Sequence, residues 1–388
     1  MSEPDIRPYR LVVPDQAIAD LRERLRRTRW PDDYVDHDWD FGTDQNYLKA
    51  LCAYWVDGYD WRVREAKINA WPHFTTSLDE HEIHFIHVKS TSPKAQPLLI
   101  THGWPGSFVE MLKIIPMLTE PQRFGGDAND AFDVVVPSLP GFGLSGRPMQ
   151  AGTNPRVIAG LFASLMQRLG HQRFCAQGGD FGASITVWLA RDHADKLTGF
   201  HLNMMPGSLR PAPGSLAATP ATSAEKKLMA DAADFLEREG GYSHIQRTKP
   251  QTLGYGLNDS PTGLAAWIVE KFRSWSDCGG DVEAVLSRDE LLDNISLYWF
   301  TQTITSSVRL YRESARVPLQ ISAGERIIPP LGFARFPKEL VRPPREWLER
   351  FFNLVHWTDM PRGGHFAAME QPVLLAQDIR KFFRSLRG

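Results

Sequence analysis

Apolar residues recur every three or four positions in the first part of the chain, which is the spacing of amphipathic helices. This spacing predicts helices over 15–28, 43–56 and 61–69. From residue 74 onward short apolar runs alternate with helical stretches, which are expected over 108–118 and 155–169. The apolar runs predict strands at 74–77, 82–88, 98–101, 132–136, 174–176 and 197–203. Strands that alternate with helices favour a parallel sheet covered on both faces.

The pattern changes between residues 206 and 315, where helical segments dominate. Helices are expected there over 223–239, 262–275 and 288–300. A strand is predicted to resume at 317–323, another follows at 354–358, and an amphipathic helix over 372–386 closes the chain. We therefore expect a helical lid inserted into an α/β sheet domain, with a Pro/Ala/Ser-rich linker at 211–220.

Three units follow from these patterns, one of them built from two stretches of the chain. Residues 1–75 form an N-terminal segment, and its tryptophans are expected to anchor it to a larger core. The sheet domain takes residues 76–205 and 316–388, and the helical lid takes residues 206–315.

Composition narrows the possible functions. Of the 388 residues 42% are hydrophobic and 23% are charged, which is typical of a globular protein. The net charge of -2 suggests binding neither to nucleic acid nor to an anionic membrane. The N-terminus lacks the apolar core of a signal peptide, and no apolar run approaches the ~20 residues of a spanning helix. Three cysteines offer neither a disulfide framework nor a metal motif, so we expect a soluble, cytoplasmic protein.

The candidate chemistry centres on Gly178-Gly179-Asp180-Phe181-Gly182, between the strand expected at 174–176 and a buried helix. Small residues on both sides of a reactive one are typical of a nucleophile elbow, a sharp and strained turn. The central residue is Asp180 rather than serine or cysteine. A carboxylate at this position attacks carbon and forms an ester with the enzyme, so Asp180 is the predicted nucleophile.

A second candidate is His365, which follows two glycines after the last expected strand. The order nucleophile, acid, histidine is that of the α/β-hydrolase fold, in which the histidine reaches back to the elbow as the base. The acid stays open on sequence order alone, because Glu325, Glu339 and Asp359 all lie between Asp180 and His365.

The segment His102-Gly103-Trp104-Pro105 follows a strand and precedes a helix. In this fold the backbone N–H of Trp104, together with that of Phe181, is expected to form an oxyanion hole. The side chains of this segment mostly shape the loop, because the donors are backbone groups.

An aspartate nucleophile suits two main reactions, cleavage of a carbon–halogen bond and opening of an epoxide. A dehalogenase often has Trp directly after the nucleophile and Asn after the His-Gly pair, where this chain has Phe181 and Trp104. An epoxide leaves as an alkoxide and needs a proton donor, which tyrosine supplies because its ordinary pKa is ~10. Tyr242 and Tyr311 stand out in the lid, although spacing alone also fits simple packing.

Three other functions are alternatives to that of an epoxide hydrolase. A haloalkane or haloacid dehalogenase would share the fold. A non-catalytic binding module is disfavoured by the intact set of candidate residues. An ester hydrolase is disfavoured by Asp180 in the place of a serine.

Nearly end to end, the chain resembles the microsomal-type epoxide hydrolases. The segments that are similar to signatures of that family are Thr28-Arg29-Trp30-Pro31-Asp32, Asp60-Trp61-Arg62, His102-Gly103-Trp104-Pro105-Gly106-Ser107-Phe108, Gly178-Gly179-Asp180, Gly241-Tyr242-Ser243-His244-Ile245-Gln246, Leu257-Asn258-Asp259-Ser260-Pro261 and Arg362-Gly363-Gly364-His365-Phe366-Ala367-Ala368. The resemblance implies an α/β-hydrolase fold with a mostly parallel sheet, a helical lid and an N-terminal meander that wraps the core. The resemblance includes no counterpart of the N-terminal membrane anchor that the endoplasmic-reticulum members carry, so a soluble protein is expected.

The resemblance also implies roles for individual residues. Asp180 would be the nucleophile, His365 the base, and Glu339 the acid that orients His365. Tyr242 and Tyr311 match the two tyrosines that activate the epoxide. The expected reaction needs no cofactor and converts an epoxide and water to a vicinal diol. The aromatic lid favours an aryl or bulky apolar epoxide, in detoxification or antibiotic biosynthesis. Relatives often pair as homodimers.

Overall fold

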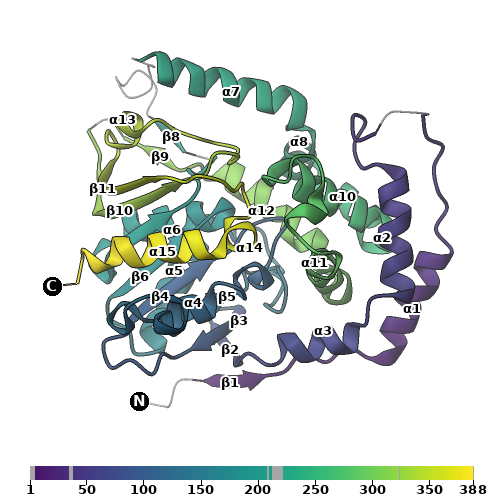
Figure 1. The fold of residues 1–388 in the computed structure, drawn as a ribbon, viewed down its shortest axis with the longest axis horizontal. Helices are drawn as coiled ribbons and strands as arrows, with labels where there is room; N and C mark the ends of the chain where they lie inside the picture. Colours follow the sequence, from purple (N-terminus) through teal and green to yellow (C-terminus); the bar gives the residue numbers. More distant parts are fainter. Residues whose placement is uncertain (1–4, 35–37, 208, 212–221, 323, 388) are drawn as a thin grey trace.

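The computed structural model describes residues 5–34, 38–207, 209–211, 222–322 and 324–387. Its core is a nine-stranded sheet in the order β1-β2-β3-β5-β4-β6-β7-β10-β11 (Figure 1). The strands are β1 (Ile6–Tyr9), β2 (His73–Leu78), β3 (His81–Val88), β4 (Gln96–Thr101), β5 (Phe132–Pro137), β6 (Phe174–Gly178), β7 (Leu197–Leu202), β10 (Ile327–Arg335) and β11 (Phe352–Asp359).

The sheet is parallel from β5 through β4, β6, β7 and β10 to β11. The pairs β1–β2, β2–β3 and β3–β5 are antiparallel. The mostly parallel α/β-hydrolase sheet predicted from the sequence is therefore confirmed. Because parallel strands end at one edge, the residues that follow β4, β6, β10 and β11 come close together there.

Helices cover both faces of this sheet (Figure 1). On one face α5 (Pro155–Arg168) packs on α6 (Asp180–Asp192), and α6 lies against β4, β6 and β7. On the other face α15 (Pro372–Arg384) contacts α4 (Ile115–Thr119), β7 and β10. The remaining short helices are η1 (Phe108–Met111), η2 (Pro121–Phe124), η3 (Ala128–Asp130), η4 (Ala194–Lys196), η6 (Val282–Ala284), α13 (Arg345–Leu348) and α14 (Ala367–Glu370). No helix among the described residues combines the length and apolarity needed to cross a bilayer.

Helices fill the stretch for which a lid was predicted. They are α7 (Ser223–Glu239), α8 (Gly241–Thr248), α9 (Pro250–Asp259), α10 (Pro261–Trp275), α11 (Arg288–Thr301) and α12 (Ile304–Arg316), and together they are called the helical insertion. The sequence pattern missed α8 and α9, because glycines weaken their helix propensity. Packing explains one of these glycines: a Cβ on Gly254 of α9 would lie 2.5 Å from the Thr305 hydroxyl of α12. Both helices pack against α12, which the pattern also missed.

Two expectations about local structure were wrong, and one strand was not expected. The helix expected over 108–118 is broken into η1 and α4, because Pro116 lacks an N–H and fits best in the first turn of a new helix. The strand expected at 317–323 is the two-residue β9 (Gln320–Ile321), which pairs with β8 (Arg210–Pro211) outside the main sheet. The real strand β10 was missed because Pro329 and Pro330 argue against a central strand. A register shift between Ile327 and Pro330 accommodates them. The linker predicted at 211–220 lies outside the described residues, apart from Pro211.

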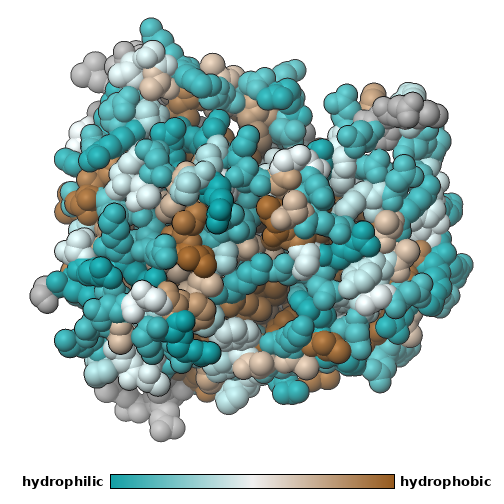
Figure 2. Space-filling view, viewed as in Figure 1, coloured by the Kyte–Doolittle hydropathy of each residue, from teal (hydrophilic) through white to brown (hydrophobic). Residues whose placement is uncertain are grey.

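The N-terminal segment extends from one edge of the sheet to the helical insertion. Its strand β1 pairs with β2, and α3 (Trp61–Ile68) leads away from the sheet towards α1 (Asp15–Arg26) and α2 (Gln45–Asp57), which contact α10 (Figure 1). The buried Trp55 indole donates to the Ser296 hydroxyl at 2.9 Å, and Trp61 packs on Phe300 with ring centroids 4.8 Å apart. Figure 2 shows hydrophilic residues over most of this face of the molecule, with hydrophobic residues gathered towards its middle.

A buried ion pair joins this segment to α11, and its removal is expected to destabilise the fold. Arg64 donates from Nε to Oδ1 of Asp293 at 2.7 Å, and Tyr59 donates to the same oxygen at 2.9 Å. Asp293→Ala leaves the nearly buried Arg64 without its main partner, which typically costs ~3–5 kcal/mol of unfolding free energy. Urea denaturation measures the loss. The control is Asp289→Ala, because Asp289 also contacts Arg64 but is 37% exposed and should contribute no more than ~1 kcal/mol. Equal losses in the two variants would contradict this prediction.

Candidate active site

Asp180 lies on a strained turn between β6 and α6, at the carboxyl edge of the sheet. Its φ angle is +50°, which is uncommon for a residue other than glycine and often marks a functional site. The turn requires glycine on both sides. A Cβ on Gly178 would lie 2.3 Å from the Gly182 carbonyl oxygen, and one on Gly182 would lie 2.0 Å from that of Thr101. The predicted elbow geometry is therefore present, with the Asp180 side chain at its apex.

The Asp180 carboxylate has two close polar neighbours. The backbone N–H of Trp104 donates to its Oδ1 at 2.9 Å, and Nε2 of His365 lies 3.5 Å from its Oδ2. Gly103 leaves room for this contact, because a Cβ there would lie 2.2 Å from Oδ1. The N–H of Phe181 lies in the first turn of α6, where N–H groups have no acceptor within the helix. The residues expected to form an oxyanion hole thus adjoin Asp180.

His365 is buried and held in place by Glu339. Nδ1 of His365 lies 2.8 Å from Oε1 of Glu339, and the backbone N–H of His365 donates to the Trp275 carbonyl at 3.0 Å. The loop that carries Glu339 follows β10, and the loop that carries His365 follows β11. The Lys338 N–H donates to the Gly363 carbonyl at 3.1 Å and so ties the two loops together.

The other two acids left open by the sequence lie elsewhere. Glu325 pairs with Arg191 of α6, with Oε1 2.6 Å from the Arg191 Nε. Asp359 is largely exposed at the end of β11, where it accepts from the Trp357 indole at 3.1 Å. Of the three candidate acids, the structure brings Glu339 to His365.

The electrostatics of His365 depend on its two carboxylate neighbours. Burial by itself lowers its pKa, but the charge on Glu339 and the contact with Asp180 oppose burial and raise the pKa well above its usual value. The two carboxylates on either side of the imidazole therefore favour its protonated form. If the charge on Asp180 were lost, one of the two groups that raise this pKa would be lost with it.

Tyr242 of α8 and Tyr311 of α12 face each other across the site, with ring centroids 5.8 Å apart. Burial, and after it the negative charge of Asp180, raises the pKa of Tyr242. Burial also raises the pKa of Tyr311 well above its usual value, with the charge of Asp180 adding to the effect. Both phenols therefore stay protonated at neutral pH, and the charge on Asp180 contributes to this by raising their pKa values.

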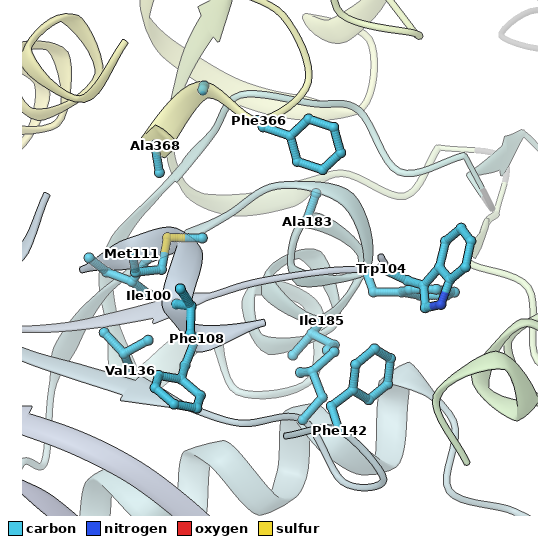
Figure 3. Close-up of a cluster of buried hydrophobic side chains, with 14 of the residues drawn as sticks. Ile100, Trp104, Phe108, Met111, Val136, Phe142, Ala183, Ile185, Phe366 and Ala368 are labelled. Atoms are coloured by element: carbon cyan, nitrogen blue, oxygen red, sulfur yellow. The ribbon is translucent and has the colours of Figure 1, made fainter. Parts of the chain in front are cut away.

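Aromatic rings surround the two phenols. Trp104 stacks on Tyr242 with centroids 5.6 Å apart, and Phe181 meets Tyr311 edge-on at 4.8 Å. Trp275 packs 5.2 Å from Tyr242 and 5.1 Å from the His365 ring. Figure 3 shows the Trp104 side chain turned towards the helical insertion, while Phe366 lies above the start of α6. The two phenols are therefore packed mainly among apolar, aromatic side chains.

The sequence pattern missed several polar residues at the site. A cavity of about 20 Å³ is bounded by the Asp180 and His365 side chains, and also by Glu110, Gln177 and Asn203. The cue for Glu110 was its place just after the His102-Gly103-Trp104 segment, but no spacing rule connects it to the elbow. A larger hollow of about 1340 Å³ between α1 and α10 includes none of the five predicted side chains and is not the site of this chemistry.

Two family descriptions match the chain. Residues 6–111 match "Epoxide hydrolase N terminus", and residues 96–239 match "alpha/beta hydrolase fold". The first of these covers the N-terminal helices and β1 to β4, and the second covers the elbow.

Individual relatives agree with these matches over almost the whole chain. A Stigmatella aurantiaca protein assigned to the epoxide hydrolases is 47% identical over 99% of this chain and 86% of its own. Epoxide hydrolase 1 of Sus scrofa is 40% identical over 97% of this chain and 88% of its own. The solved structure of the Bombyx mori juvenile hormone epoxide hydrolase has a TM-score of 0.85 at 32% identity, covering 99% of this chain and 94% of its own. The predicted resemblance is thereby confirmed, and the chain belongs to the microsomal-type epoxide hydrolase family.

Proposed function

We propose that the enzyme converts an aryl or bulky apolar epoxide to a vicinal diol through an ester on Asp180. The observation that supports this most is the arrangement around the Asp180 carboxylate. A peptide N–H lies 2.9 Å from it and an imidazole lies 3.5 Å from it, and its charge contributes to raising the pKa of two phenols. An aspartate nucleophile, a histidine base and two acids match the needs of epoxide opening and ester hydrolysis.

The first step forms the ester. Tyr242 and Tyr311 hydrogen-bond the epoxide oxygen, and a carboxylate oxygen of Asp180 attacks one ring carbon from the opposite side. The bond from that carbon to the epoxide oxygen breaks, and the oxygen takes a proton from one of the two phenols. The products are a hydroxyalkyl ester on Asp180 and a phenolate, which regains its proton later in the cycle.

The second step hydrolyses the ester. When Asp180 is esterified its negative charge is gone, so the pKa of His365 falls and the imidazole can act as a base. His365 takes a proton from water, and the oxygen attacks the Asp180 carbonyl carbon. The backbone N–H groups of Trp104 and Phe181 stabilise the oxyanion. Its collapse releases the diol and restores the carboxylate, while Glu339 keeps the imidazole oriented and stabilises its positive charge.

The substrate class is inferred from the surface around the phenols. Trp104, Trp275 and Phe181 surround the two tyrosines, and flat aromatic surface favours an aryl or bulky apolar group beside the epoxide. Relatives from Ctenocephalides felis and Bombyx mori are named for juvenile hormone. Detoxification and antibiotic biosynthesis are the two roles we propose, and identifying the natural epoxide would distinguish them.

The test is turnover of racemic styrene oxide in ¹⁸O-labelled water. Diol from the first turnover should carry unlabelled oxygen, because that oxygen comes from Asp180, and label should enter in later turnovers. Labelled diol in the first turnover would mean direct attack by water and would overturn the ester route. Halide release from a chlorinated alkane, without diol formation from any epoxide, would instead favour the dehalogenase.

Removing either phenol oxygen is expected to slow ring opening strongly. Tyr242→Phe and Tyr311→Phe keep the ring contacts but lose a proton donor, and acid catalysis of this kind contributes ~10²–10⁴-fold. We expect about 10²-fold slower ester formation in each variant and a larger loss in the double variant. Rapid-quench single turnovers measure this rate. Tyr255→Phe is the control, because Tyr255 is an exposed phenol on α9. Unchanged ester formation in the double variant would contradict the proposed role.

A further inference from the structure

Glu110 is a buried acid that the two steps above do not use. It lies in η1, six residues after Trp104, and is 8% exposed. Its carboxyl group sits directly over Gly106, because a Cβ on Gly106 would lie 1.4 Å from the Glu110 Oε1. A side chain at position 106 would therefore displace this carboxyl, so the glycine leaves the space that Glu110 occupies.

Glu110 faces the cavity between the candidate nucleophile and the candidate base. The cavity measures about 20 Å³, and its walls include Asp180, His365 and Glu110. Holding one water molecule takes roughly 10–15 Å³, so the space suits a single water. Gln177 lines the same cavity, and its buried side-chain oxygen has no hydrogen-bond partner among the described residues. Polar groups on several sides of a water-sized space indicate a built water site.

The elements on both sides hold this arrangement in place. η1 packs against α14, which begins two residues after His365. Figure 3 shows Phe108 and Met111 of η1 pointing into the same hydrophobic cluster as Ala368 of α14. Glu110 and His365 are thus set on neighbouring backbone segments whose apolar side chains pack together, and this packing fixes the spacing between the carboxyl and the imidazole.

The charge state of Glu110 suits a site beside an anionic nucleophile. Burial raises its pKa to about 8, with the charge of Asp180 adding to the effect and His365 and the Ser107 N–H opposing it. At neutral pH the group is mainly a neutral carboxylic acid. It can then both donate to and accept from a water, and it places no second negative charge next to Asp180.

Glu370, another buried glutamate near His365, provides a contrast. Its oxygens accept backbone N–H groups of Asp277, Gly364 and Phe366 at 2.8–3.0 Å, so they are already used to shape the His365 loop. Glu110 has one such backbone contact, with the Ser107 N–H, and its carboxyl borders the cavity.

We propose that Glu110 is a positioning residue that holds the hydrolytic water between its own carboxyl, Nε2 of His365 and the carbonyl carbon of the Asp180 ester. This inference rests on the proposed function and concerns its second step. The water proton passes to His365 and the water oxygen bonds to the carbonyl carbon, while Glu110 gains and loses no proton. Ring opening needs no water, so Glu110 should matter for ester hydrolysis and hardly at all for ester formation.

The experiment separates the two steps in Glu110→Met, which keeps the side-chain length without hydrogen-bonding capacity. Rapid quench with styrene oxide and intact-protein mass spectrometry give the rates of adduct formation and decay. We expect hydrolysis to slow about tenfold, as for a lost hydrogen bond in a buried site, while ester formation stays within about threefold. The ester should therefore accumulate in the steady state. Glu110→Gln, a neutral group of the same shape, should restore most of the hydrolysis rate.

Controls separate this role from a structural one. Glu120→Gln, a partly exposed glutamate outside the site, should change neither rate. If Glu110→Met does not fold, Glu110→Ala, which adds space rather than bulk, gives the same comparison. Ester decay at the wild-type rate would overturn the proposal, and so would an equal fall in both rates together with the melting temperature. Diol production by the wild type through direct water attack, without any adduct, would instead overturn the ester route itself.

Discussion

Asp180→Asn is expected to lower diol formation by on the order of 10⁴-fold or more, because an amide is not a nucleophile towards an epoxide carbon. Asparagine has the same shape, and its side-chain oxygen can still accept from the Trp104 N–H. The elbow should therefore fold as before, so the loss of activity would come from the missing nucleophile and not from misfolding. Steady-state turnover of styrene oxide measures it, alongside the thermal unfolding of the variant.

The matched control for this variant lies at the other end of the same helix. Asp192 is the last residue of α6 and pairs with Arg156 at 2.6 Å on the surface. Asp192→Asn should therefore leave diol formation close to that of the wild type. Activity that slowly returns in Asp180→Asn should coincide with hydrolysis of the amide back to Asp180, which intact mass detects. Free turnover by the variant while its mass remains that of asparagine would contradict the ester route.

Sequence pattern alone predicted those parts of the site that are encoded locally. The elbow could be predicted because its strain demands Gly178 and Gly182 around Asp180 within five residues. His365 could be predicted because a glycine-rich segment after the last strand is recognisable without knowing what it touches. The buried strands β4 to β7 were predicted for a similar reason, since continuous apolar runs are typical of parallel sheets.

Features that depend on distant packing could not be predicted in the same way. Sequence order did not distinguish Glu339 from Glu325 and Asp359 as the acid. The reason is that β10 contains two prolines and was not recognised as the strand before the acid. Recognising β10 would have placed Glu339 four residues beyond its end. The helices α8 and α9 have weak helix propensity and form against α12. Tyr242 and Tyr311 meet through this packing, so only the family resemblance indicated their pairing in advance.

His365→Gln is expected to stop the reaction at the ester. Ring opening requires no base, so Asp180 should still be alkylated once per enzyme molecule. Hydrolysis should slow by about 10²–10⁴-fold, the usual contribution of a general base. Intact mass spectrometry should show one added substrate mass per chain after mixing with styrene oxide, and peptide mapping should place it on Asp180. Glu339→Gln should give a smaller slowing, because it leaves the base present but removes the negative charge 2.8 Å from Nδ1.

The pH dependence of ester hydrolysis follows from the charges around His365. In the free enzyme Glu339 and Asp180 outweigh burial and raise the pKa of His365 well above its usual value. Esterification removes the contribution of Asp180, so the pKa in the ester is lower and the hydrolysis rate of the wild type should rise with pH up to that lower value. The slow hydrolysis in His365→Gln should lack this titration. His193→Gln, at the end of α6, is the control and should retain both the titration and full turnover. Full turnover by His365→Gln with no adduct would exclude His365 as the base and leave the hydrolytic water without an assigned proton acceptor.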